Sequence, residues 1–314
     1  MKGPAGPSKP PRGRERGLRE RGGAGAVKEN RAFRVARGAF LLLLAASVAL
    51  PLYMTVSVSL QTMPEVYAQS PVLVPARPQF HNYAAAMNNG NWPRYFLNSG
   101  LVTLLTVAIS LFINAMSGFV FARVPFRGRN ALFLTILLGM MVPPQVTLIP
   151  VFTLLKSTPL AGGNDWLGRG GSGLINTHTG LILPFVAGSF GVFLCRQFYL
   201  AFPAELDDAA RIDGCGRFSQ FVRVYLPLSG PVLASLGILK FTGTWNEYTW
   251  PLVITSGDAM KTVQLALASY RDEAEVIWNQ LMAATLIAGA PIYIAFFFAQ
   301  KHFVSGLLAG SVKG

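Results

Sequence analysis

Carboxylates that could take part in chemistry are concentrated in one segment, residues 203–227. Four of them fall close together there: Glu205, Asp207, Asp208 and Asp213. Acid–base catalysis or metal binding by such a cluster would need further donors nearby, most often histidines. The three histidines are scattered along the chain without metal-ligand spacing. The sequence therefore predicts no catalytic residue, no metal site and no cofactor, and the acidic segment needs another explanation.

The acidic segment begins with the signals of a short helix. Pro203 suits a first helical turn, because its missing N–H would have been unpaired there, and the acidic residues that follow lie at the positive end of the helix dipole. Asp207 and Arg211 are four apart, so we expect them to face each other. Gly214 supplies the left-handed residue that ends such a helix.

A second short helix follows the glycine. Phe218, Phe221, Val222 and Tyr225 recur at i, i+3, i+4 and i+7, which predicts an amphipathic helix. In the first helix, the pair Ala209-Ala210 leaves little side-chain bulk, so another surface could approach its backbone. An ordinary capped surface loop would explain these signals too. A long ordered connection is nevertheless uncommon between two apolar stretches and indicates a docking element.

The rest of the chain is too apolar for a soluble protein. Of its 314 residues, 52% are apolar and 13% are charged, whereas soluble domains have about 25% charged residues. A bilayer core about 30 Å thick requires about 20 apolar residues per helix. The sequence offers six such stretches: 38–61, 95–122, 130–155, 174–196, 227–254 and 276–300. Alternating patterns are absent, so we predict an all-α integral membrane protein with six transmembrane helices.

Basic residues predict the orientation. Residues 1–37 carry eleven Lys or Arg against three Glu, and we expect a disordered tail that faces anionic lipid in the cytoplasm rather than nucleic acid. The other basic connections, 123–129 and 197–226, fall on the same side as the tail, so both termini are predicted to be cytoplasmic. Residues 38–314 form one predicted membrane domain. Its first apolar run is too long for a cleaved signal peptide.

One charged pair lies within an apolar stretch. Lys240 and Glu247 are seven residues apart and so share a helix face. A charge at mid-bilayer costs about 2.5–3.5 kcal/mol, so these side chains either line a translocation path or make a packing contact with a partner, with snorkelling a further alternative. Trp245 and Asn246 could stack on and hydrogen-bond a sugar, although interfacial anchoring explains the aromatic residue equally well.

The acidic segment has a recognisable spacing: Asp208-Ala209-Ala210, three residues, Gly214, nine residues, Val224, one residue and Leu226-Pro227. This resembles the EAA loop of ABC-importer permeases, with Asp208 in place of Glu and Val224 in place of Ile. The runs SGFVFARVPFRGRN, MVP, WNEYTWPL and GLLAGSVKG are also similar to the carbohydrate-uptake group that contains the maltose-type permeases. Within it, the chain resembles the second permease of the pair.

The resemblance implies a type I importer fold in which the loop, residues 203–227, forms coupling helices that dock in a cleft of a separate ATPase. The coupling residues it implies are Glu205, Asp208, Ala209, Ala210, Asp213, Gly214, Leu226 and Pro227. No phosphate-loop motif occurs in the chain, so ATP must be hydrolysed by another subunit. The implied partners are a second permease subunit, two ATP-binding subunits, an extracytoplasmic solute-binding protein and membrane lipid.

We therefore predict a non-enzymatic permease subunit of an ATP-driven importer for oligosaccharides or similar polyols, in the bacterial inner or plasma membrane. Permeases for glycerol phosphate or another non-sugar solute look alike and remain an alternative. A polytopic membrane transferase would need a different acidic or histidine cluster, and a secondary transporter would need intramembrane acids for ion coupling. The sequence does not identify the solute.

Overall fold

The computed structural model describes residues 31–271 and 276–311, with side chains between residues 33 and 298. Most of the predicted tail lies outside the described residues, and helix α1 (Arg31–Ser59) already begins within it. The chain divides into two units, Met1–Tyr53 and Met54–Gly314, with the boundary inside α1. The described residues are helical apart from loops and one isolated β-bridge between Arg271 and Val276, in agreement with the predicted all-α class.

The second unit is built around one long helix, α4 (Trp92–Arg123), which follows two short helices, α2 (Met63–Val66) and α3 (His81–Asn88). After it come α5 (Arg129–Leu138), α6 (Pro144–Lys156), α7 (His178–Ile182), the 3-10 turn η1 (Leu183–Phe185) and α8 (Ser189–Leu200). The acidic segment forms α9 (Glu205–Ile212), α10 (Arg217–Gln220), the π-helix η2 (Phe221–Tyr225) and α11 (Leu226–Leu228). The chain ends with α12 (Gly230–Trp245), α13 (Thr249–Ile254), η3 (Asp258–Met260), α14 (Val263–Ala268) and α15 (Trp278–Ser311).

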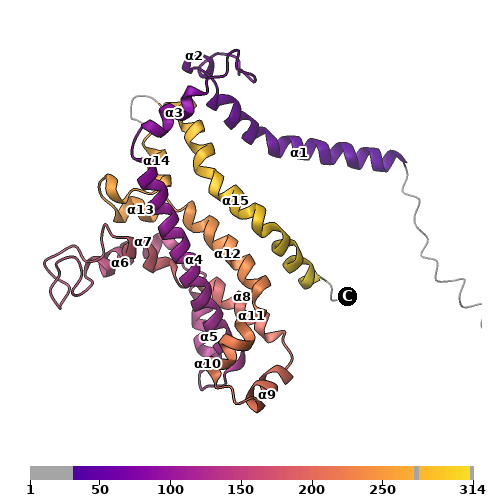
Figure 1. The fold of residues 1–314 in the computed structure, drawn as a ribbon, viewed down its shortest axis with the longest axis vertical. Helices are drawn as coiled ribbons and strands as arrows, with labels where there is room; N and C mark the ends of the chain where they lie inside the picture. Colours follow the sequence, from indigo (N-terminus) through magenta and orange to yellow (C-terminus); the bar gives the residue numbers. More distant parts are fainter. Residues whose placement is uncertain (1–30, 272–275, 312–314) are drawn as a thin grey trace, which may run out of the picture. The chain divides into compact units, whose positions relative to one another are not determined.

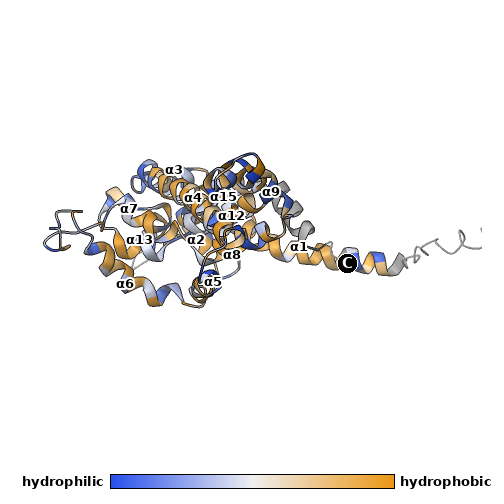
Figure 2. Ribbon diagram, turned by 90° about the horizontal axis from the view of Figure 1, so that it is seen from below, coloured by the Kyte–Doolittle hydropathy of each residue, from blue (hydrophilic) through white to orange (hydrophobic). Residues whose placement is uncertain are grey.

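In the part of the chain that the structure describes, three helical segments are long and apolar enough to cross a membrane: Phe33–Ser59, Trp92–Arg123 and Trp278–Phe298. Two further spans qualify only as bent pairs. One joins His178–Phe185 to Ser189–Leu200 with a bend of 47°, and the other joins Arg217–Leu228 to Gly230–Trp245 with a bend of 78°. Figure 2 shows that the helices of the bundle are mainly apolar.

The predicted stretches 130–155, 174–196 and 227–254 each form more than one helix. The first breaks between α5 and α6, where Gly139 ends one helix and Pro143 and Pro144 begin the next. A proline has no N–H to donate and clashes with the preceding turn, so a helix restarts at it more readily than it passes through it. The second stretch bends between Phe185 and Ser189, and the third bends at Ser229 and is interrupted again between α12 and α13.

Helix α4 runs between α3 at one end and α9 and α10 at the other (Figure 1). We call these the α3 end, which contains Trp92, and the α9 end, which contains Arg123. Its most extensive contact is with α8. A Cβ added at Gly118 would lie only 2.5 Å from the Cβ of Cys195 in α8, so the two backbones touch without a side chain between them. This close contact fixes where α8 ends relative to α4.

Candidate functional site

The acidic segment folds as predicted into two short helices joined by a glycine turn. Helix α9 begins at Glu205, so Pro203 precedes the helix rather than lying in its first turn. Gly214 has φ of +73°, and no atom lies within 4 Å of a Cβ built there. A glycine is therefore needed at position 214 for its backbone conformation rather than for space, because only glycine adopts this φ without strain. The N–H of Cys215 closes the turn on the carbonyl of Ala210 at 2.9 Å.

The outward face of α9 is exposed and carries few bulky side chains. Asp208 and Ala209 are exposed, and Asp208 pairs with Arg211 at 3.4 Å, with their side chains 68% and 56% exposed. Ile212 is 86% exposed and Phe218, in α10, is 64% exposed. Two apolar side chains beside an acidic residue and an alanine make a surface suited to a protein partner. Sequence analysis had not singled out Ile212.

The two alanines do not share a role. Ala209 is exposed, whereas Ala210 is only 4% exposed. Of the remaining predicted coupling residues, Glu205, Asp213 and Pro227 are exposed, while Leu226 is half-buried. The structure therefore splits the predicted set into an outward group and a group that shapes the segment from within.

The expected pair between Asp207 and Arg211 is wrong. Arg211 bonds to Asp208 instead, and Asp207 points to the inner side of α9. There its Oδ2 lies 3.3 Å from Nη1 of Arg123, and its Oδ1 accepts hydrogen bonds from Oη of Tyr225 at 2.7 Å and from Nε2 of Gln220. Three donors from other helices outweigh one donor from the next turn of the same helix.

A cluster of rings lies around Tyr225, which donates to this carboxylate. Tyr225 lies 4.8 Å from Phe119, 5.5 Å from Tyr199 and 5.6 Å from Phe202, measured between ring centres. Tyr199 and Tyr225 are fully buried, and Oη of Tyr199 lies 2.7 Å from Oγ of Ser229. The second predicted helix is therefore amphipathic in part: Phe221 and Tyr225 are buried, while Phe218 and Val222 are exposed.

Lys240 and Glu247 do not pair with each other, and each has another hydrogen-bond partner. Nζ of Lys240 donates to the carbonyl of Phe185 at 3.0 Å, and Oε1 of Glu247 accepts from the backbone N–H of Trp250 at 3.0 Å. Lys240 thus supplies a donor to a backbone carbonyl at the bend between η1 and α8. Glu247 caps the first turn of α13, in keeping with the preference for carboxylates at the N-terminus of a helix.

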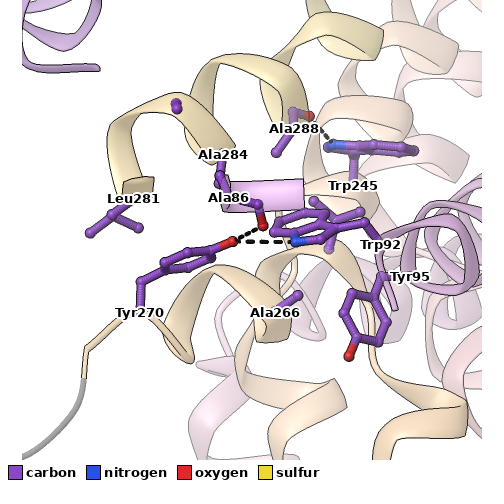
Figure 3. Close-up of a cluster of buried hydrophobic side chains, with 11 residues drawn as sticks. Ala86, Trp92, Tyr95, Trp245, Ala266, Tyr270, Leu281, Ala284 and Ala288 are labelled. Atoms are coloured by element: carbon purple, nitrogen blue, oxygen red, sulfur yellow. Dashed lines mark hydrogen bonds between the residues drawn. The ribbon is translucent and has the colours of Figure 1, made fainter. Parts of the chain in front are cut away.

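Trp245 is a core residue of this subunit. Its indole is 5% exposed, stacks on Phe241 with ring centres 5.8 Å apart, and donates its N–H to the carbonyl of Ala288 at 3.0 Å (Figure 3). No free face is left on which a sugar could stack. The neighbouring Asn246 is exposed, and its Oδ1 accepts from Nε2 of Gln264 at 2.9 Å.

A small cavity adjoins Glu247. Its volume is about 10 Å³, and Thr103 and Thr262 are among its polar lining residues. The hydroxyl groups of these two threonines have no hydrogen-bond partner although both residues are buried. A volume of about 10–15 Å³ is the least that one water molecule occupies, so this cavity is far too small for a sugar.

Comparison with known proteins decides the family. The sequence pattern of the family described as "Binding-protein-dependent transport system inner membrane component" matches residues 114–308, which include the whole acidic segment. The chain belongs to this family. The permease is therefore a membrane transport component rather than a membrane transferase or a secondary transporter, and its fold is the one expected of ABC-importer permeases.

Two curated relatives illustrate the range of the family. The permease is 36% identical to the arabinooligosaccharides transport system permease protein AraQ of Bacillus subtilis, over 75% of this chain and 79% of that protein. It is 32% identical to the sn-glycerol-3-phosphate transport system permease protein UgpE of Agrobacterium fabrum, over 83% of this chain and 91% of that protein. Both relatives are transport permeases, not enzymes.

A solved structure supports the fold. The permease resembles one chain of a bacterial ABC transporter involved in the import of the acidic polysaccharide alginate, with a TM-score of 0.74, 21% identity, and coverage of 88% of this chain and 98% of that chain.

Sequence analysis did not single out Arg123, which lies at the end of α4 and contacts α8 and α9. Only its place within the basic turn 123–129 had been noted.

Proposed function

We propose that the permease is one transmembrane subunit of an ATP-driven importer that takes up oligosaccharides or similar polyols by alternating access. The observation that carries this proposal is the outward face of α9, which is small, acidic and exposed on an otherwise membrane-like chain. The family membership of the chain and its similarity to an arabinooligosaccharide permease support oligosaccharides as the solute class.

In this proposal the outward face docks on a separate ATPase subunit. Ala209 lets the partner approach the backbone of α9, Asp208 exchanges Arg211 for a basic residue of the ATPase, and Ile212 adds apolar contact area. An exposed ion pair contributes less than about 1 kcal/mol, so this exchange is easy. Glu205, Asp213 and Gly214 border the face, and Ala210, Leu226 and Pro227 hold its shape.

The proposed assembly contains a second permease subunit, two ATP-binding subunits and an extracytoplasmic solute-binding protein. The permease crosses the membrane six times, through α1, α4, α5 with α6, α7 with α8, α12 and α15, and α9 faces the cytoplasm, as do both termini. The basic residues near α9 support this orientation. Lys240, Asn246 and Glu247 line the path of the solute, and Trp245 packs behind them.

Glycerol phosphate is the second candidate solute. A relative of comparable similarity is a glycerol 3-phosphate permease, and the two solute classes share hydroxyl groups but differ in charge. Uptake by cells with and without the permease gene separates the two. Uptake of a labelled arabinooligosaccharide that requires the gene supports the main proposal, whereas gene-dependent uptake of glycerol 3-phosphate alone replaces the solute class.

The assembly is tested by purifying the tagged permease from its own membranes in mild detergent and identifying the bound proteins by mass spectrometry. We expect an ATPase and a second permease. The variant Ala209→Trp should lose the ATPase, because an indole on the outward face blocks close docking.

The matched control is Ala84→Trp, on the exposed side of α3 at the opposite end of α4. This variant should keep the ATPase. Recovery of the wild-type permease with no ATPase, or equal recovery of the ATPase with both variants, would contradict the docking of α9.

A further inference from the structure

Asp207 and Asp208 are neighbours in sequence but lie on opposite sides of α9. The side chain of Asp208 is 68% exposed, whereas that of Asp207 is 15% exposed and its partner Arg123 is 10% exposed. The outward carboxylate belongs to the proposed docking face. The inward carboxylate belongs to a contact between helices of this chain, and the family pattern that begins at Asp208 does not include it.

Arg123 joins the end of α4 to the end of α8. Its Nε and Nη2 donate to the carbonyl of Tyr199 at 3.1 Å and 2.6 Å, and Nη2 also donates to the carbonyl of Phe202. The last carbonyls of a helix lack partners within the helix, so a guanidinium that binds them fixes where the helix ends. Its remaining Nη1 reaches Asp207, so one side chain holds α8 and α9 together.

Asp207 extends the same link to the following elements. Its Oδ1 accepts hydrogen bonds from Oη of Tyr225 and from Nε2 of Gln220. Tyr225 is 0% exposed and Gln220 is 1% exposed. The guanidinium carbon of Arg123 also lies 5.6 Å from the ring centre of Tyr225. Tyr225 closes a π-helical turn, a distortion that is frequent at functional sites. One carboxylate thus connects α9 with α4, α10 and η2.

We propose that Asp207 and Arg123 are positioning residues that carry movement of the docking helix α9 into the membrane helices α4 and α8. This inference rests on the proposed function, in which a partner moves α9. The physical reason is the difference between the two pairs. The exposed pair of Asp208 can open and change partners, whereas separating the largely buried pair of Asp207 would leave a charge without its partner where little water can replace it.

A purely structural role is the alternative, in which the pair only helps the segment to fold. The two roles differ in what the assembled complex does. If the pair has only a structural role, its loss lowers the amount of complex that forms. If the pair has a positioning role, its loss lowers the amount of solute that the assembled complex transports for each ATP hydrolysed. The ratio of transport to ATP hydrolysis therefore separates the two roles independently of yield.

The test uses the whole complex, purified with its ATPase and second permease and reconstituted in lipid vesicles with its solute-binding protein. Asp207→Asn keeps the shape of the side chain but removes its charge. Arg123→Lys keeps the charge but removes the fork that reaches Tyr199 and Phe202. We expect each variant to lower transport per ATP roughly tenfold, within the usual range of coupling between sites. The double variant should be no worse than the worse single variant, because both break one link.

Asp258→Asn is the matched control, because it makes the same carboxylate-to-amide change in an exposed ion pair, with Lys261, at the α3 end. Its transport per ATP should equal that of the wild type. The proposal is overturned if Asp207→Asn and Arg123→Lys assemble with a wild-type ratio, or if they reduce only the amount of complex. Failure of the proposed function looks different: the wild-type complex itself would then lack an ATPase or would not transport.

Discussion

The two ends of α4 are each held by residues far along the chain, but by different chemistry. At the α9 end, a guanidinium binds two carbonyls and a carboxylate, all largely buried. At the α3 end, Nδ2 of Asn98 donates to the carbonyls of Ala259 and Lys261, both at 2.9 Å, and Tyr95 donates to Asp258 at 2.6 Å. The charged groups of the first set of contacts are largely enclosed. At the α3 end the charged side chains of Arg94, Asp258 and Lys261 lie near solvent, and the buried donor is the neutral amide of Asn98.

This difference matters for how each end can move. A largely buried charge is strongly destabilised when it loses its partner. A neutral amide that loses a bond loses about 1 kcal/mol, and an exposed carboxylate loses less because water replaces its partner. The α9 end should therefore move as a unit with α8 and α9, while the α3 end can loosen step by step. Four predictions test this contrast, from the largest effect to the smallest.

Arg123→Ala should have the largest effect. It leaves Asp207 without its charged partner and the carbonyls of Tyr199 and Phe202 without donors, so we expect the free energy of unfolding to fall by about 3–5 kcal/mol. Denaturant unfolding in detergent measures this. Arg94→Ala is the control, because Arg94 also donates through Nε to a carbonyl, that of Ala259, but is exposed at the α3 end. Equal losses in the two variants would remove the contrast.

Gly118→Ala should come next. The new Cβ would lie 2.8 Å from the backbone N of Arg196, so α8 must shift, at a cost of about 2–3 kcal/mol. Gly100→Ala, on the same helix towards the α3 end, meets no atom within 4 Å. It should stabilise the helix by up to about 1 kcal/mol, because alanine is the better helix former. Thermal unfolding of the two variants side by side gives the comparison, and a loss at Gly100 would argue against it.

Asn98→Ala should have an intermediate effect. It removes two hydrogen bonds to carbonyls and the contact of Oδ1 with Nε2 of His178 at 3.1 Å, so we expect a loss of about 1–2 kcal/mol. The loss should stay below that of Arg123→Ala measured in the same detergent. If Asn98→Ala lost more free energy of unfolding than Arg123→Ala, the contacts at the α3 end would be the stronger ones, and the contrast between the ends would be reversed.

Asp258→Asn should have the smallest effect, and it should depend on pH. Hydrogen bonds from Lys261 and from Tyr95 lower the pKa of Asp258. A lowered pKa means that the carboxylate stabilises the fold fully above its unfolded value of about 3.9, and that this contribution disappears as the pH falls through the lower folded value. The wild type and the variant should therefore differ at neutral pH and converge in acid. A difference that persists unchanged at pH 3 would contradict this assignment.

The sequence predicted what depends on composition and on local backbone. The apolar stretches became helices, and Gly214 adopted the left-handed conformation expected of it. Hydropathy alone does not predict whether such a stretch forms one helix or two. Hydropathy counts apolar side chains, but whether a helix passes through Pro143 or Pro227 depends on whether neighbouring helices or turns satisfy the freed carbonyls. That information lies in the packing rather than in the stretch itself.

Roles within the candidate site were harder to predict for the same reason. The four-residue rule paired Asp207 with Arg211 because it considers one helix alone, whereas the actual partner, Arg123, lies 84 residues away. Trp245 was a candidate for sugar stacking, but the carbonyl of Ala288, which takes its N–H, belongs to a helix that the sequence could not place beside it. Long-range partners decide which side of a helix is a surface.

The close contact of α4 with α8 also gives the two cysteines of the permease different access to thiol reagents. Cys195 is fully buried beneath Gly118, and Cys215 is half-exposed one residue after the turn at Gly214. A thiol reagent should modify Cys215 first, and a partner seated on α9 should slow that reaction. Modification of Cys195 requires α8 to separate from α4. The natural cysteines therefore record docking and helix separation in one labelling experiment, with no residue introduced for the purpose.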